Sequence, residues 1–179
     1  TWPFGDVLRE NGEKFMLKKF LMIAVVVLFS AGQSFGGLII SQYYEGTSTN
    51  KWIELYNNGP SAFDLSTVRV GVWSNANAEG YKTNVAANSS FLLSGSLAVG
   101  NTFILGNNAN TLPSYATANV NNNAVINFNG NDSIGLYTDG PFSTANLLDA
   151  IGFTDSGNEG EDRSFVRLNA NAGFNITAR

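Results

Sequence analysis

Two short runs of alternating apolar and polar residues, joined by a polar loop, constrain the fold of this chain more than any other stretch. The runs are residues 38–44 and 51–57, and Gly, Ser, Thr and Asn make up most of the loop between them. Because successive side chains of a strand point to opposite faces, Ile53 and Leu55 face one side and Glu54 faces the other. The pattern predicts two β-strands joined by a polar loop, with Ile53 and Leu55 in a core.

Similar runs recur along the rest of the chain, each bounded by Gly, Asn, Ser or Pro, and helical periodicity is missing beyond residue 36. This recurrence is typical of an all-β protein, and seven to nine strands predict a two-sheet β-sandwich. Residues 74–88 lack a clear strand pattern, although residues 80–83 are a further candidate. The expected strands are residues 38–44, 51–57, 68–73, 90–93, 101–105, 124–128, 133–138, 147–153 and 164–168.

The core of this sandwich should come from the apolar members of the strands. Cysteine is absent, so no disulfide supports the fold. A chain of this size buries about two-thirds of the surface that it exposes when unfolded, which is enough for a substantial core. We expect much of that core from Ile40, Ile53, Leu55, Phe103, Ile104, Ile134, Leu136 and Val166.

Residues 16–36 have the three parts of a secretory signal peptide. Met16 is followed by two lysines, ten apolar residues and a stretch that contains small residues. Cleavage after Gly36 fits best, since Ser34 and Gly36 are then the small residues at positions −3 and −1. A spanning helix needs roughly 20 apolar residues, so an uncleaved membrane anchor is the weaker alternative.

Residues 1–15 lie before this start. The codons of Gly12 and Glu13 can spell a purine-rich ribosome-binding sequence just ahead of the Met16 codon. We interpret residues 1–15 as translated upstream leader, with a genuine N-terminal extension as the alternative. The mature domain is then expected at residues 37–179, which is one domain's worth of chain.

Composition excludes several kinds of chemistry. Histidine and cysteine are both absent, which removes Ser-His-Asp catalysis, Cys-His catalysis and histidine-ligated zinc. The net charge of −4 is unfavourable for contact with phosphate backbones. We therefore expect no enzyme activity, no cofactor and no direct nucleic-acid binding.

Six motifs along the chain combine turn residues with apolar strands, and their order is more specific than any one of them. They are Trp52–Asn57, Ala62–Ser66, Leu92–Leu105, Phe128–Tyr137, Leu148–Gly152 and Asp162–Arg167. In this order, residues 38–168 resemble the bacterial lamin-tail domain, a small immunoglobulin-like β-sandwich found on exported proteins. The family would continue into a final strand after Arg179, so we expect the C-terminal end of the domain to be truncated.

The resemblance implies a non-catalytic interaction or structural module that is secreted or displayed on the cell surface. Its partner would be an unknown protein or a surface polysaccharide, and no membrane span would remain after signal cleavage. Two alternatives stay open. Lamin-tail domains also occur on exported nucleases and phosphatases, so the chain can be the N-terminal appendage of a truncated enzyme. A calcium-dependent adhesion module is the other alternative.

The calcium alternative depends on the acidic loop Asp155–Asp162, which contains four acidic residues and two glycines. Calcium takes six to eight oxygen ligands, which a flexible loop can supply. The spacing of the acidic residues in this loop does not match an EF-hand. Residues 129–132 offer further oxygens, although a hairpin with Gly130 in a tight turn explains them. We expect a solvated loop and no metal-binding residue at either place.

Three other groups of side chains are candidates for chemistry. Glu45 and Glu54 are conceivable as a glycosidase pair, but we expect them to accept loop hydrogen bonds or to pair with Lys51. Arg163 and Arg167 should face one side of a strand and form a structural ion pair with a carboxylate. We expect most of the aromatic residues near the strands to be buried, with an exposed sugar-binding platform as the alternative. These aromatic residues are Tyr43, Tyr44, Trp52, Tyr56 and Trp73.

Overall fold

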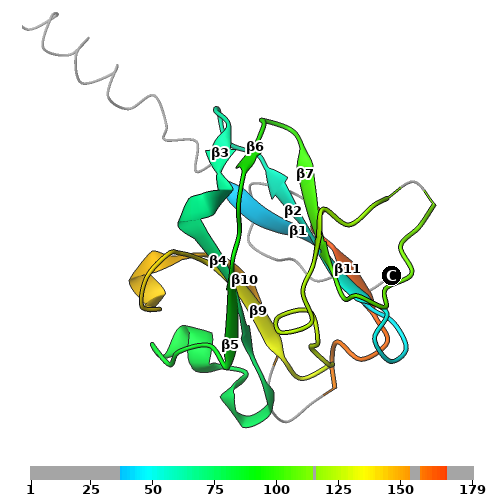
Figure 1. The fold of residues 1–179 in the computed structure, drawn as a ribbon. Coiled ribbons are helices and arrows are strands. Elements are labelled where there is room, and N and C mark those ends of the chain that lie inside the picture. Colours follow the sequence, from blue (N-terminus) through cyan, green and yellow to red (C-terminus); the bar gives the residue numbers. More distant parts are fainter. Residues whose placement is uncertain (1–36, 115, 154–157, 169–179) are drawn as a thin grey trace, which may run out of the picture. The chain divides into compact units, whose positions relative to one another are not determined.

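The computed structural model of the chain describes residues 37–114, 116–153 and 158–168, which form a sandwich of two β-sheets (Figure 1). The predicted upstream leader (residues 1–15) and the predicted signal peptide (residues 16–36) lie outside the described residues. The first sheet has the order β11 (Ser164–Val166), β1 (Leu38–Glu45), β2 (Lys51–Asn57), β7 (Thr102–Gly106) and β8 (Val120–Asn121). The second has the order β10 (Leu147–Ile151), β9 (Ser133–Thr138), β4 (Val68–Trp73) and β5 (Ser89–Leu92). A small third sheet pairs β3 (Phe63–Asp64) with β6 (Ser96–Leu97).

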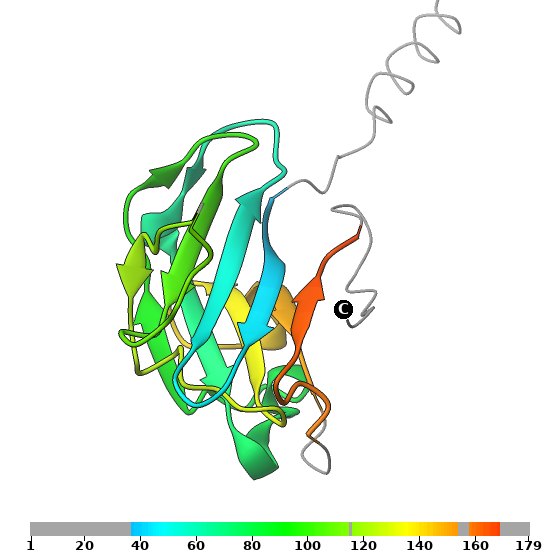
Figure 2. The same ribbon diagram turned by 90° about the vertical axis from the view of Figure 1, so that its right-hand side faces the viewer.

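The all-β sandwich expected from the sequence is confirmed. Strands β2, β4 and β9 have the predicted bounds, and five further strands overlap the predicted runs with ends that differ by one or two residues. Every strand pair is antiparallel except β7 with β8, which is parallel. Figure 2 shows β11, β1, β2 and β7 side by side, and the last residue of β11, Val166, pairs with Gln42 in the middle of β1.

The strand predicted at residues 124–128 is wrong. The Asn122 side chain accepts hydrogen bonds from the backbone N–H groups of Ala124 and Val125, at 2.9 and 3.3 Å. The backbone N–H of Ile126 donates to the Asn122 carbonyl at 2.9 Å, which folds the segment into a turn. Asn favours such local hydrogen bonds over a ladder. The apolar run is nevertheless buried, because the turn points Val125 and Ile126 into the core.

Several short elements do not follow the sequence pattern. Residues 80–82 form the 3-10 helix η3 (Gly80–Lys82) in place of the candidate strand at 80–83. Three other 3-10 helices are η1 (Leu65–Thr67), η2 (Asn75–Asn77) and η4 (Thr144–Asn146). With the two-residue strands β3, β6 and β8, the described residues contain eleven strands, against the seven to nine expected. Elements of two or three residues are too short to show a period in the sequence.

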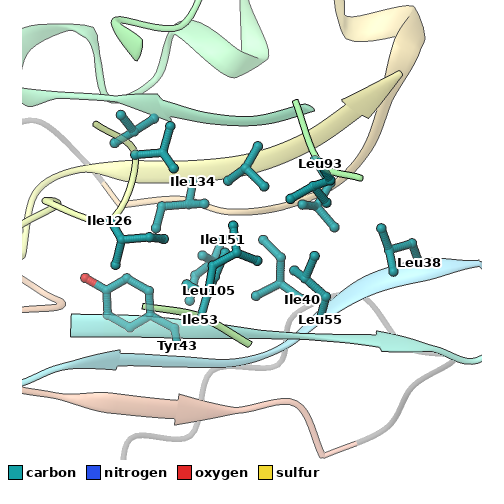
Figure 3. Packing of buried hydrophobic residues seen from close by; sticks show 14 of the residues in the cluster. Leu38, Ile40, Tyr43, Ile53, Leu55, Leu93, Leu105, Ile126, Ile134 and Ile151 are labelled. Atoms are coloured by element: carbon teal, nitrogen blue, oxygen red, sulfur yellow. The ribbon is translucent and has the colours of Figure 1, made fainter. Parts of the chain in front are cut away.

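The core lies between the two large sheets, as Figure 3 shows for Ile40, Ile53 and Leu55 opposite Ile134. Five predicted core residues are fully buried, namely Ile40, Ile53, Leu55, Ile134 and Leu136. The prediction for Val166 is wrong, and Ile104 is buried, at 8% exposed, but it lies outside the core cluster between the sheets. Ile104 pairs with Glu54 and Val166 with Gln42, so both lie on the outer face of their sheet. Their neighbours Leu105 and Phe165 take the core positions, and Phe103 is only partly buried.

Leu55→Ala should lower the free energy of unfolding by about 2–5 kcal/mol, because it truncates a fully buried side chain and leaves a cavity. Chemical denaturation monitored by circular dichroism measures this change. Leu148→Ala is the matched control, since Leu148 is 40% exposed and should cost much less. Equal losses for the two variants would contradict the placement of Leu55 in the core.

Candidate functional site

Glu45 lies at the end of β1 in a buried group with Lys51 and Tyr43. Lys51 Nζ is 2.9 Å from Glu45 Oε1, and the Tyr43 hydroxyl donates to Glu45 Oε2 at 2.7 Å. The Lys51 ammonium also lies 5.9 Å from the centre of the Phe128 ring. Burial, reinforced by the Glu45 carboxylate, raises the pKa of Tyr43 well above its ordinary value, so the hydroxyl remains a donor. The predicted pairing of Glu45 with Lys51 is confirmed.

Glu54 is on the opposite face of the same sheet. Its Oε1 accepts a hydrogen bond from the Ser41 hydroxyl at 2.7 Å. Glu45 faces the interior with Tyr43, whereas Glu54 lies between the core residues Ile53 and Leu55 and points outward. Two carboxylates on opposite faces of one sheet cannot flank a single glycosidic bond. The geometry excludes a glycosidase pair made of these two residues.

A second ion pair joins the two sheets through Asp149 on β10. Nη2 of Arg167 lies 2.8 and 2.6 Å from the two Asp149 carboxylate oxygens. The backbone N–H of Ile40 donates to Asp149 Oδ2 at 2.7 Å, and Arg167 Nε donates to the Ile40 carbonyl at 3.1 Å. The register of β1 against β2 shifts between Ile40 and Gln42, next to this contact.

Among the described residues, the expected ion pair is formed by Arg167. Arg167 follows β11, and its side chain is almost buried against Asp149. Burial raises the pKa of Asp149, and the Arg167 guanidinium partly offsets this effect. Arg163 precedes β11 and is exposed, while its backbone carbonyl accepts the N–H of Glu45 at 2.9 Å. Arg167 is therefore a structural clamp between sheets.

Residues 129–132 form a turn into β9 rather than the expected hairpin, because no strand precedes them. The buried Asp132 carboxylate accepts the backbone N–H groups of Asn75 and Asn129, both at 2.9 Å. Glycine is required at position 130 because the backbone of Glu161 lies close to it. A Cβ there would overlap the backbone of Glu161, and the Gly130 carbonyl accepts the N–H of Gly160 at 2.9 Å. This turn anchors the acidic loop to the sandwich.

The acidic loop itself is only partly within the described residues, since Asp155 lies outside them. Glu159, Glu161 and Asp162 are exposed, and Glu161 accepts a hydrogen bond from the Asn158 amide at 2.7 Å. Across the ranges that the structure describes, no group of three acidic side chains is arranged to hold a metal ion. Whether this loop binds calcium stays a prediction, with the negative result expected.

Most of the candidate aromatic residues are buried, as expected. Tyr43 packs in the core against three phenylalanines, with ring centres 4.6 to 5.7 Å apart. Trp73 lies on the outer face of the second sheet, where its Nε1 donates to the Val85 carbonyl at 2.8 Å. Its ring packs over Gly71 and Gly135, which leave room for it. These positions exclude a single platform made of all five aromatic residues.

Tyr44 and Trp52 form an offset stack on the outer face of the first sheet, with ring centres 5.3 Å apart and an interplanar angle of 15°. Trp52 is only 4% exposed. Its indole Nε1 has no hydrogen-bond acceptor among the described residues, and Trp52 Nε1 is the one buried side-chain polar atom there in that state. Tyr56, two positions beyond Glu54 on the same face, is half-buried.

Sequence reasoning missed two fully or almost fully buried asparagines. The Asn57 amide donates to the carbonyls of Ser61 and Leu97, at 2.9 and 2.8 Å, and its oxygen accepts the N–H of Gly59. The Asn107 amide donates to the Ile126 carbonyl at 2.7 Å. Asn57 ends β2 and Asn107 follows β7. An exposed Asn at the end of a strand looks the same in the sequence, so their burial could not be predicted from it.

The chain has a distant structural relative among solved proteins. A DUF4876 family protein from Bacteroides thetaiotaomicron is similar in structure, with a TM-score of 0.47 and 11% identity. The match covers 65% of this chain and 53% of that protein, so this chain spans about half the length of that relative. No curated protein matches the chain. Within its described part, the chain contains no helix that is long and apolar enough to cross a membrane.

The two packed β-sheets form a small immunoglobulin-like β-sandwich. The sequence model of the Lamin Tail Domain family matches residues 31–155, which is most of the chain. The chain therefore belongs to the lamin tail domain family.

Proposed function

We propose that this chain is a non-catalytic interaction module of an exported protein, which is secreted or displayed on the cell surface. One observation carries the proposal. The two carboxylates that the sequence offered for chemistry are engaged in the sandwich: Glu45 binds Lys51 and Tyr43, and Glu54 accepts the Ser41 hydroxyl. Carboxylates that form these contacts stabilise the fold and are not available for catalysis. The module would therefore act by binding a partner at its surface.

Membership of an immunoglobulin-like family supports the same conclusion, since such sandwiches commonly present surfaces and loops to partners. The signal-like residues 16–36 support export. No observation on the described residues favours the appended-enzyme or calcium-adhesin alternatives.

Export makes a direct prediction about the mature end of the protein. Expressed from Met16 in a bacterial host, the protein should be recovered outside the cytoplasm with Gly37, or a residue close to it, at its N-terminus. Mass spectrometry of the N-terminal peptide measures this. Val26→Arg places a charge in the apolar run and should keep the protein inside the cell. Exported protein that still begins at Met16 would contradict cleavage.

Interaction is tested by incubating the purified protein with isolated bacterial cell envelopes and separating bound from free protein by sedimentation. The proposed function predicts saturable binding. It also predicts no turnover of phosphodiester or nitrophenyl glycoside substrates. Absence of envelope binding, or turnover that is lost in Glu54→Gln, would overturn the proposal.

A further inference from the structure

The stacked pair Tyr44 and Trp52 carries an inference about the ligand of this module. The pair lies on the outer face of the first sheet, away from the core between the sheets. An indole N–H is a donor only, and leaving it buried without an acceptor is unfavourable. The Trp52 Nε1 is in this state among the described residues. A ligand oxygen placed against it would remove that cost.

A short turn at residues 107–111 lies beside the indole. Gly106 is the direct cross-strand partner of Trp52, so a Cβ on Gly106 would point to the same face. Such a Cβ would overlap the Asn110 amide and come within 2.7 Å of Asn121 Oδ1. The amide groups of Asn110 and Asn121 are therefore next to Trp52, and they bond to each other at 3.0 Å.

The turn is held mainly by polar contacts. The backbone N–H of Thr111 donates to Asn50 Oδ1 at 2.7 Å, and that of Asn107 donates to the Lys51 carbonyl at 2.9 Å. Asn107 is anchored by its amide to the Ile126 carbonyl at 2.7 Å, whereas Asn108, Ala109 and Thr111 are exposed. A segment with few buried apolar contacts opens at low cost relative to the core. Figure 1 shows the chain between β7 and β8 on the side of the first sheet away from β4 and β9.

We propose that Tyr44 and Trp52 bind a neutral glycan when the turn at residues 107–111 moves away from them. The proposal rests on the interaction function above and names its ligand class. Aromatic rings pack against the apolar face of a sugar, while the indole N–H and the amide of Asn121, which lies on β8 outside the moving turn, match its hydroxyl groups. The Glu54 carboxylate, one position along the same face, disfavours an acidic glycan.

The test uses the purified protein labelled with nitrogen-15, and follows the indole N–H signals by nuclear magnetic resonance. The probes are cellohexaose, xylohexaose and mannohexaose, with hexagalacturonic acid as the acidic comparison. At least one neutral probe should move the Trp52 signal saturably. The Trp73 signal is the internal control, since its N–H is already bonded to the Val85 carbonyl.

Three variants separate binding from folding. Trp52→Phe keeps an aromatic ring and removes the N–H, so affinity should fall about three- to tenfold. Tyr44→Ala removes the stacked ring and should lower the affinity for the glycan about tenfold or more. Asn50→Ala removes the contact that holds Thr111, so the open state becomes more populated and affinity should rise about threefold or more. A purely structural role for Asn50 predicts no such rise.

The proposal is overturned if no neutral probe moves the Trp52 signal, if Tyr44→Ala binds as the unchanged protein does, or if the acidic probe binds best. Sedimentation with cell envelopes keeps this result separate from the proposed function. Envelope binding that persists without glycan binding overturns the glycan ligand alone. Loss of envelope binding in the unchanged protein overturns the interaction function as well.

Discussion

Lys51→Met should lower the free energy of unfolding by about 3–5 kcal/mol, because it leaves a buried carboxylate without its counter-charge. The side chains of Lys51 and Glu45 are 9% and 4% exposed, so water cannot replace the lost ammonium. The methionine fills similar volume, which confines the change to the charge. Urea denaturation at neutral pH measures the loss.

The double variant Lys51→Met with Glu45→Gln is the control for this prediction. The carboxamide introduced by Glu45→Gln would be neutral and would still accept the Tyr43 hydroxyl, so most of the lost stability should return. If the double variant is as unstable as Lys51→Met alone, then packing of the lysine stem, and not its charge, dominates at this site.

Arg167→Leu should produce a loss of similar size, about 3–5 kcal/mol, for a related reason. Asp149 would keep its hydrogen bond from the Ile40 N–H but would lose the guanidinium that faces both of its oxygens. The two sheets would also lose a direct link, because Asp149 is on β10 while Arg167 follows β11 of the other sheet. Thermal unfolding followed by calorimetry gives the change.

Arg163→Leu is the matched control, since it makes the same replacement four residues earlier at an exposed position. Its cost should be within about 0.5 kcal/mol. A large loss for Arg163→Leu, or none for Arg167→Leu, would contradict the clamp described for Arg167.

The strands could be predicted from sequence because each repeats a local rule. In residues 51–57 and 133–138, apolar side chains and turn residues at the ends agree with each other, so period and bounds were both correct. In residues 124–128 the apolar run indicated burial correctly, but hydrogen bonds to the Asn122 side chain hold the backbone in a turn instead of a strand. An apolar run reports whether a segment is buried, and does not by itself report that it is extended.

Adjacent apolar residues set a second limit. In Phe103, Ile104 and Leu105, and again in Phe165 and Val166, every residue is suited to either face of a sheet. Only the pairing of Ile104 with Glu54, and of Val166 with Gln42, fixes which one points outward. Register is a property of two strands, so one strand's sequence cannot supply it.

The candidate site follows the same logic. Glu45 and Lys51 are six residues apart across a short loop, and their pairing was within reach of sequence reasoning. The Ile40 backbone and Asp149 are 109 residues apart and lie on strands of different sheets, so no local sequence pattern predicts their contact. The unpaired indole of Trp52 depends on the turn at residues 107–111, which a strand pattern does not place.

The neighbouring positions of β1 and β11 have a mechanical consequence. The strands are antiparallel, with Gln42 opposite Val166 and Tyr44 opposite Ser164, so residues 38 and 168 leave the sandwich at the same end. Tension applied between these two points would peel the pair apart one hydrogen bond at a time, instead of shearing all of them together. The contact of Arg167 with Asp149 lies where that peeling starts. The first resistance to peeling of this strand pair therefore comes from the ion pair together with the backbone hydrogen bond from the Arg167 N–H to the Ser41 carbonyl at 2.9 Å.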